Sequence, residues 1–259
     1  MKNNNPIGLF DSGIGGTTIC TEVIKLLPHE NTMFLADQKY APYGIKTQQE
    51  IIDLSIKNVS YLVENNCKLV IVACNTATTN AIEALRSTFE IPIIGIEPAI
   101  KPAALQTKTS KIGVLATKGT ITSDFFSSKI KLYPEVEIIE QIGYNLVNLI
   151  ETGQLHSQEI KDLLKEYLTP MVEKGIDTLV LGCTHYPYLT PMIQEIIPNT
   201  IRIIDSGEAV AKQTKKLLIE HSILNQQTEE GIHTYYTNIN PTILQSFTPL
   251  GSIVEQCDF

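Results

Sequence analysis

LVIVACNT at residues 69–76 and TLVLGCTH at residues 178–185 are two versions of one pattern. Each is an apolar run rich in Val, Leu and Ile that ends at a cysteine and continues with hydroxyl, amide or imidazole side chains. Such a run predicts a buried strand of a parallel sheet. Ligands of open α/β sheets bind just beyond the carboxyl ends of the strands. Cys74 and Cys183, one in each half of the chain, therefore predict a single cleft lined from both sides.

Strand and helix patterns alternate along the whole chain. Strands are predicted at residues 7–10, 32–35, 69–73, 91–96, 112–115, 137–139, 178–181, 201–204 and 231–236. Helices are predicted at residues 16–27, 47–65, 78–89, 157–174, 188–197 and 208–221. This alternation predicts an α/β fold built from βαβ units, with mostly parallel sheets flanked by helices.

The two halves also resemble each other. YLVENN at residues 61–66 and PMVEKG at residues 170–175 precede the two cysteine strands at one offset, 109 residues. A repeat of this length favours two similar domains, although any two βαβ units share some likeness. We predict a first domain at residues 1–98 plus 208–259, because the strand count favours a C-terminal return, and a second at 99–207. Residues 101–111 are the predicted linker.

Bulk properties narrow the class of protein. The chain has 259 residues, a net charge of −8 and 43% hydrophobic residues, as expected of a globular protein and not of a nucleic-acid binder. Neither a membrane-spanning segment nor a signal peptide is expected from the sequence. Five cysteines without a Cys-x-x-Cys pair favour reduced thiols and a cytoplasmic location.

The two strand-end cysteines allow several chemistries. A helix beginning beside each thiol is expected to lower its pKa, with Asn75 and Thr76 as helix caps and Pro187 in the first turn of the second helix. A disulfide would need close thiols, and zinc would need more ligands than Cys183 and His185 supply. A cysteine nucleophile with His185 as its base leaves Cys74 unused. A reaction in which one thiolate removes a proton from a carbon acid and the other thiol returns one from the opposite face would use both cysteines. Cys20, Cys67 and Cys257 are interpreted as small buried hydrophobic residues.

Two further segments follow predicted strands. FDSGIGG at residues 10–16 resembles a dinucleotide-binding loop, but Thr18 stands where its last glycine belongs. Its backbone N–H groups could still bind an anion such as a carboxylate. Asp11 is either a helix cap or a polar group of the cleft. The Pro42-Tyr43-Gly44 run is either an ordinary turn or a loop that presents its backbone and Tyr43 to a ligand.

Four motifs together resemble the glutamate racemases of the aspartate/glutamate racemase superfamily. They are FDSG with GG at residues 10–16, PYG at 42–44, ACNTAT at 73–78 and GCTHYP at 182–187, in the family's order. The resemblance implies interconversion of L- and D-glutamate without a cofactor or metal, supplying D-glutamate for peptidoglycan. It also implies two α/β domains with the substrate between them, commonly in a homodimer.

Residue roles follow from the same resemblance. Cys74 and Cys183 are the implied acid/base thiols, facing the D- and L-enantiomer respectively; Asp11 assists Cys74, while His185 and Glu151 assist Cys183. The implied substrate-binding residues are Asp11, Ser12, Pro42, Tyr43, Gly44, Asn75, Thr76, Thr117, Thr120, Thr184 and His185. An aspartate or hydantoin racemase is the nearest alternative, and a non-catalytic amino-acid-binding protein is an alternative from another class.

Overall fold

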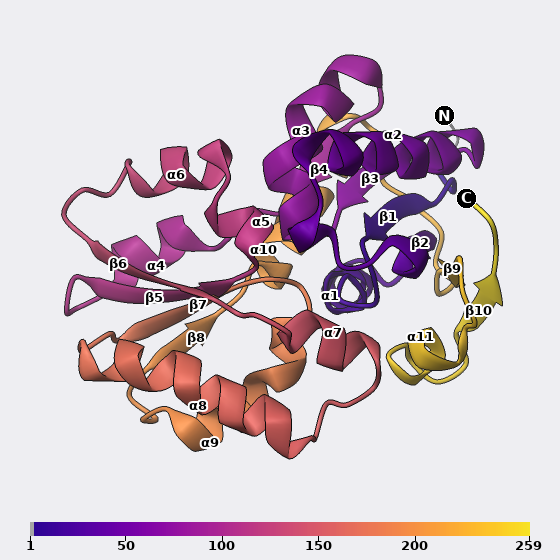
Figure 1. Cartoon of the computed structure of the whole chain (residues 1–259). Coiled ribbons are helices and arrows are strands. Elements are labelled where there is room, and N and C mark those ends of the chain that lie inside the picture. The colour runs from indigo at the N-terminus through magenta and orange to yellow at the C-terminus, as the bar shows by residue number, and fades with distance from the viewer. Residues whose placement is uncertain (1–2) are drawn as a thin grey trace.

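The computed structural model describes residues 3–259, so residues 1 and 2 of the predicted first domain lie outside the described part. Two parallel sheets stand side by side, each covered by helices (Figure 1). The strands of the first are β1 (Ile7–Asp11), β2 (Thr32–Ala36), β3 (Leu69–Val72), β4 (Ile93–Gly95), β9 (His233–Thr237) and β10 (Ile253–Gln256). The strands of the second are β5 (Lys111–Ala116), β6 (Glu137–Ile142), β7 (Thr178–Gly182) and β8 (Arg202–Ile204).

The two sheets repeat one topology. The first has the order β10-β9-β2-β1-β3-β4 and the second β6-β5-β7-β8, so β2-β1-β3-β4 and β6-β5-β7-β8 are equivalent. Every strand pair in the described part is parallel. The fold class is therefore confirmed, and Cys74 and Cys183 follow equivalent central strands, β3 and β7.

Longer helices cover the sheets. They are α1 (Thr17–Leu26), α2 (Gln48–Glu64), α3 (Asn75–Thr88), α8 (Gln158–Glu173) and α10 (Gly207–Glu220). Successive strand residues point to opposite faces: Leu9 and Ile71 belong to the apolar cluster that contains α1 residues, whereas Phe10 and Val72 belong to that of α2 and α3. The central strands are buried on both faces, which explains their continuous apolar sequences.

Several shorter elements were missed by the sequence prediction. They are α4 (Ile100–Gln106), α5 (Lys118–Ile121), α6 (Asp124–Ile130), α7 (Leu146–Glu151) and α11 (Thr242–Ser246). The helix predicted at residues 188–197 is present as α9 (Thr190–Ile196), which begins two residues later. The first part of the predicted linker at residues 101–111 is occupied by α4, and its role as a linker stays a prediction. Pro102 lies in the first turn of α4, where a helix tolerates proline, and Ile100 and Ala103 are buried.

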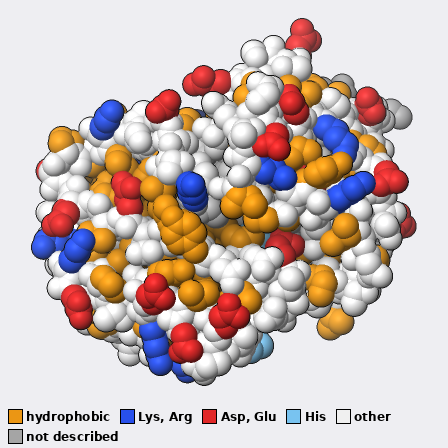
Figure 2. Space-filling view, in the orientation of Figure 1, with side chains coloured by type: hydrophobic (Ala, Val, Ile, Leu, Met, Phe, Trp, Pro, Cys, Tyr) orange, Lys and Arg blue, Asp and Glu red, His pale blue; other side chains and the backbone are white. Residues whose placement is uncertain are grey.

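The chain returns to the first sheet at its C-terminal end, where β9 pairs with β2 and β10 pairs with β9. Helix α10, which precedes them, packs on α1. The division at residues 98/99 and 207/208 stays a prediction. Within residues 3–259, the helices are all too short or too polar to span a bilayer. The face in Figure 2 mixes acidic and basic side chains, and hydrophobic side chains gather toward its middle.

Candidate active site

Cys74 lies between β3 and α3 and is itself the N-cap of α3. Its Sγ accepts a hydrogen bond from the backbone N–H of Ala77 at 3.4 Å and lies 3.6 Å from Ser12 Oγ. The prediction that Asn75 and Thr76 cap this helix is wrong, because both are inside it. Burial, and then the negative charge of Asp11, raise the pKa of Cys74 well above its ordinary value. The helix acts in the expected direction, because the N–H of Ala77 lowers this pKa, but burial and Asp11 outweigh it.

Asp11 ends β1 and is completely buried. Its carboxylate accepts hydrogen bonds from the backbone N–H groups of Ser12 at 2.7 Å and Gly16 at 2.5 Å. It also accepts one from Thr184 Oγ1 of the second unit at 3.1 Å. Burial raises the pKa of Asp11, although the neighbouring His185 opposes this. Asp11 thus holds the glycine-rich turn and also joins the two units. It is not the cap of α1, because Gly16 is the N-cap of that helix.

Cys183 follows β7 and is paired with His185. His185 Nδ1 lies 3.7 Å from Cys183 Sγ, and Nε2 lies 2.5 Å from Oε1 of Glu151 at the end of α7. Burial lowers the pKa of His185, but its contacts with Cys183 and Glu151 prevail and raise it well above the ordinary value. A short 3-10 helix (Tyr186–Leu189) with Pro187 in its first turn follows, in place of the α-helix expected beside this thiol.

The glycine-rich turn binds a carboxylate of the protein itself. The N–H of Ile14 donates to Glu151 Oε1 at 2.7 Å. Gln38 Nε2 donates to the other oxygen, Oε2, at 2.9 Å. Gln38 was missed by the sequence analysis, because a lone loop glutamine carries no periodicity or motif signal.

The Pro42-Tyr43-Gly44 loop borders the cleft, but the tyrosine hydroxyl is already engaged. It donates to Asp37 and accepts a hydrogen bond from Asn58 Nδ2 at 3.1 Å. Burial and the adjacent Asp37 raise the pKa of Tyr43 well above its ordinary value, so the phenol stays protonated. The structure thus presents Tyr43 as a wall of the cleft whose hydroxyl has partners within its own unit.

Threonine hydroxyls bridge the cleft. Thr76 Oγ1 of the first unit lies 2.8 Å from Thr117 Oγ1 of the second, and Thr117 Oγ1 lies 3.1 Å from Thr120 Oγ1. The amide nitrogen of Asn75 is buried and has no hydrogen-bond partner within residues 3–259. Unpaired buried donors are uncommon in native proteins. Asn75 therefore offers a free donor at the edge of the cavity described next.

One cavity collects most of the predicted residues. Its lining comprises Ser12, Pro42, Tyr43, Gly44, Cys74, Asn75, Thr76, Thr117, Val147, Cys183, Thr184 and His185. Asp11, Thr120 and Glu151 stand behind this wall, and Val147 was not predicted. The space open to the centre of a water molecule is ≈ 20 Å³, enough for about one water. In this form the cavity is too small to hold an amino acid.

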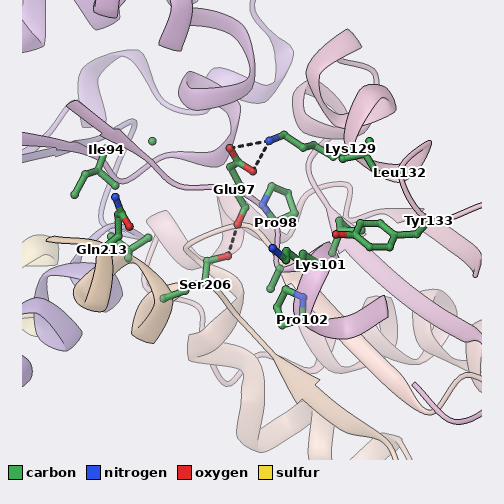
Figure 3. Close-up of a pocket in the computed structure, with 15 residues that line it drawn as sticks. Ile94, Glu97, Pro98, Lys101, Pro102, Lys129, Leu132, Tyr133, Ser206 and Gln213 are labelled. Carbon is green, nitrogen blue, oxygen red and sulfur yellow. Dashed lines mark hydrogen bonds and ion pairs between the residues drawn. The ribbon is translucent and has the colours of Figure 1, made fainter. Parts of the chain in front are cut away.

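Glu97 and Ser206, on the two segments that run between the sheets, lie next to each other (Figure 3). Ser206, before α10, donates from its hydroxyl to the carbonyl of Glu97, which lies between β4 and α4. Lys129 of α6 pairs with the Glu97 carboxylate at 2.9 Å. A larger cavity of ≈ 290 Å³ lies here, lined by apolar residues and these polar groups. The two connections between the sheets thus contact each other at this place.

Within residues 3–259, no cluster of three or more His, Cys, Asp or Glu side chains is arranged to hold a metal ion. All five cysteines are free. Cys20 and Cys67 are buried as interpreted from the sequence. Cys257 is only half-buried, with its Sγ 3.1 Å from the Tyr61 hydroxyl, so that interpretation was wrong for it.

Comparison with known proteins places this arrangement in a family. The model of the Asp/Glu/Hydantoin racemase family matches residues 16–214. Glutamate racemase from Herpetosiphon aurantiacus is 42% identical over 93% of this chain and 95% of its own length. The crystal structure of glutamate racemase isoform RacE1 from Bacillus anthracis superposes with a TM-score of 0.89 at 30% identity, covering 99% of this chain and 98% of that one.

A second solved structure carries ligands. Escherichia coli glutamate racemase in complex with L-glutamate and the activator UDP-MurNAc-ala has a TM-score of 0.84 at 32% identity, covering 97% of this chain and 98% of that one. The motifs, the duplicated sheets and these likenesses agree. The chain is an amino-acid racemase that belongs to the Asp/Glu/hydantoin racemase family and, within it, to the glutamate racemases.

Proposed function

We propose that this protein interconverts L- and D-glutamate without a cofactor, with Cys74 and Cys183 as acid and base on opposite faces of the α-carbon. The observation that carries the proposal is that one thiol from each unit lines the same closed cavity. The L-glutamate complex of the Escherichia coli relative supports the choice of substrate.

The proposed reaction moves one proton at each face. One cysteine thiolate removes the α-proton and becomes a thiol, leaving the electron pair on the α-carbon and its carboxylate. The other thiol then donates its proton from the far side and becomes a thiolate. The two sulfurs therefore have to be in opposite protonation states at the start of each turnover.

The surroundings of the thiols suit this requirement. Burial and Asp11 favour the neutral thiol at Cys74. His185 can carry a positive charge beside Cys183, and the carboxylate of Glu151 holds that imidazole. We propose that this arrangement prepares Cys183 to remove a proton and Cys74 to return one, which is the direction from L- to D-glutamate.

Neutral donors are proposed to hold the substrate. The hydroxyls of Ser12, Thr76, Thr117 and Thr184 and the free amide of Asn75 lie around the cavity. Donors fixed before the reaction stabilise the charge that develops on the substrate carboxylate more than water would. Pro42, Tyr43 and Gly44 form the wall, and Thr120 supports Thr117 from behind.

Closure of the cleft is the proposed way to exclude water from the carbanion. Two hydrogen bonds join the units in the closed form. One runs from the Thr184 hydroxyl to Asp11, and the other from the N–H of Ile14 to Glu151. Small-angle scattering should show the protein becoming more compact when glutamate is added. An unchanged radius of gyration would count against closure on the substrate.

The cellular role rests on the family. We propose that the D-glutamate formed supplies peptidoglycan synthesis, that the enzyme acts in the cytoplasm, and that it works as a homodimer. No nucleic acid or membrane partner is proposed.

The central test uses metal-stripped protein with each glutamate enantiomer in D₂O, without pyridoxal phosphate or ATP. Circular dichroism should decay to zero while deuterium enters mainly the inverted product. If aspartate is racemised and glutamate is not, the substrate proposal is wrong. If neither amino acid changes while the thiols are reduced, the protein acts on another substrate or has a binding role.

A further inference from the structure

Gln38 lies in the first unit, after β2, with its side chain turned toward the second unit. The residue is only 8% exposed. Its Nε2 donates to Glu151 Oε2 at 2.9 Å, and its Oε1 accepts a hydrogen bond from Thr237 Oγ1 at 2.8 Å. Because an ionised carboxylate only accepts hydrogen bonds, the NH₂ end of the amide has to face Glu151. Thr237 at the end of β9 then fixes the other end.

The carboxylate of Glu151 occupies a prepared site. Oε1 accepts from Ile14 N at 2.7 Å and contacts His185 Nε2 at 2.5 Å, while Oε2 accepts from Gln38. A side chain at Gly13 would place its Cβ 1.8 Å from Oε1, so only glycine leaves room for the carboxylate. Two of the three donors belong to the first unit, whereas Glu151 and His185 belong to the second.

We infer that Gln38 is a positioning residue that makes the base on the Cys183 side complete only when the cleft is closed. Closure brings Gln38 and the N–H of Ile14 to Glu151, and the two donors fix its carboxylate against His185. With the units apart, Glu151 lacks both donors and is free to turn toward water. The inference rests on the proposed two-thiol function.

Loss of the Gln38 amide should impair only the proton transfer at Cys183. The Cys74 side uses Asp11, whose donors are Ser12, Gly16 and Thr184. None of these contacts involves Gln38 or Glu151. Loss of the Gln38 amide should therefore impair proton removal by Cys183 and leave proton removal by Cys74 nearly unchanged.

The experiment distinguishes the roles of the two thiols by using 3-chloroglutamate with either the L or the D configuration at its α-carbon; these two forms are called its enantiomers below. Removal of the α-proton by one thiolate expels chloride from the neighbouring carbon, so elimination needs only one base and no proton return. Cys74→Ala and Cys183→Ala variants first establish which enantiomer depends on which thiol. If neither variant separates the two enantiomers, the two-thiol function itself fails, independently of Gln38.

Gln38→Met keeps the length of the side chain and removes the amide, and Gln38→Asn keeps the amide but shortens its reach. Both should slow elimination from the Cys183-dependent enantiomer by about 10- to 100-fold, as expected for a displaced catalytic group. The Cys74-dependent enantiomer should react within about twofold of wild type, which also shows that the variants fold.

Gln158→Leu is the matched control, because it removes a similar amide–carboxylate hydrogen bond, to Asp162, on the exposed face of α8. It should change neither rate. Equal losses for both enantiomers in both Gln38 variants, or no loss for either, would overturn the inference.

Discussion

The Cys74 side and the Cys183 side of the cleft have the same position in the fold and different chemical surroundings. Both thiols follow the equivalent strand of a β2-β1-β3-β4 or β6-β5-β7-β8 sheet. Cys74 has a carboxylate and a hydroxyl as neighbours, whereas Cys183 has an imidazole that is held by a second carboxylate. The repeated fold supplies two symmetric positions, and the side chains around the two thiols differ.

The largest effect is expected from removing either thiol. Cys74→Ala and Cys183→Ala should each lower the racemisation rate by about 10³-fold or more, because a missing acid or base stops the transfer at one face. Circular dichroism of glutamate solutions measures the rate. A variant that keeps even a tenth of the wild-type rate would show that the two sides are not both needed.

Loss of His185 should come next and should be unequal for the two directions. His185→Gln is expected to lower kcat by about 10²- to 10³-fold, with a larger loss for L-glutamate, because His185 contacts Cys183 and is proposed to assist it. Steady-state kinetics with each enantiomer provides the comparison. Equal losses of kcat in both directions would remove the assignment of His185 to one side.

The same variant makes a prediction about pH and stability. The pKa of His185 is raised in the folded protein, so its protonated form stabilises the fold. That contribution is complete below the unfolded pKa of about 6.5 and is lost as the pH rises through the higher folded value. The difference in Tm between wild type and His185→Gln should shrink as the pH rises from about 6.5. A difference that grows with pH would have the wrong sign.

Loss of the Asn75 amide should affect L- and D-glutamate alike, because this amide is proposed to bind the substrate and moves no proton. Asn75→Leu should weaken binding of both enantiomers by about 10-fold or more, as expected for a lost hydrogen bond to a charged group. The inhibition constant of an unreactive glutamate analogue can be measured alongside KM. If the variant bound only one enantiomer more weakly, Asn75 would serve the site of one thiol and not both.

The smallest effect is expected outside the thiol cavity, where Ser206 contacts Glu97. Ser206→Ala removes the hydroxyl that donates to the Glu97 carbonyl and should cost about 1 kcal/mol of unfolding free energy. Racemisation should remain within about twofold of wild type. Urea denaturation and the racemisation assay together check this, and a large loss of activity would mean that this contact controls closure.

The sequence predicted those features of the fold that follow from the pattern of apolar residues. The apolar runs that end at Cys74 and Cys183 located two equivalent strands, and parallel pairing then brings their carboxyl ends to one cleft. The pKa of Cys74 could not be predicted from its place beside a helix. A helix terminus contributes about 0.3–1 kcal/mol, less than one pKa unit, while full burial can shift a pKa by about 3–5 units.

Contacts between distant residues were also beyond the sequence pattern. Gln38 and Glu151 are 113 positions apart, and only the folded chain brings them together. The N–H groups of the glycine-rich turn were correctly interpreted as an anion site, yet Ile14 binds Glu151, a carboxylate of the protein itself. Helix α4 was missed because its short, proline-containing sequence shows no amphipathic repeat.

The most direct measurement of the two-sided account is α-proton exchange in D₂O by the single-thiol variants. Cys74→Ala should incorporate deuterium into L-glutamate with retention of configuration, because Cys183 can remove and return a proton only at its own face. Cys183→Ala should do the same with D-glutamate alone. Exchange of both enantiomers by one variant, or inversion by either, would contradict the assignment of one thiol to each face.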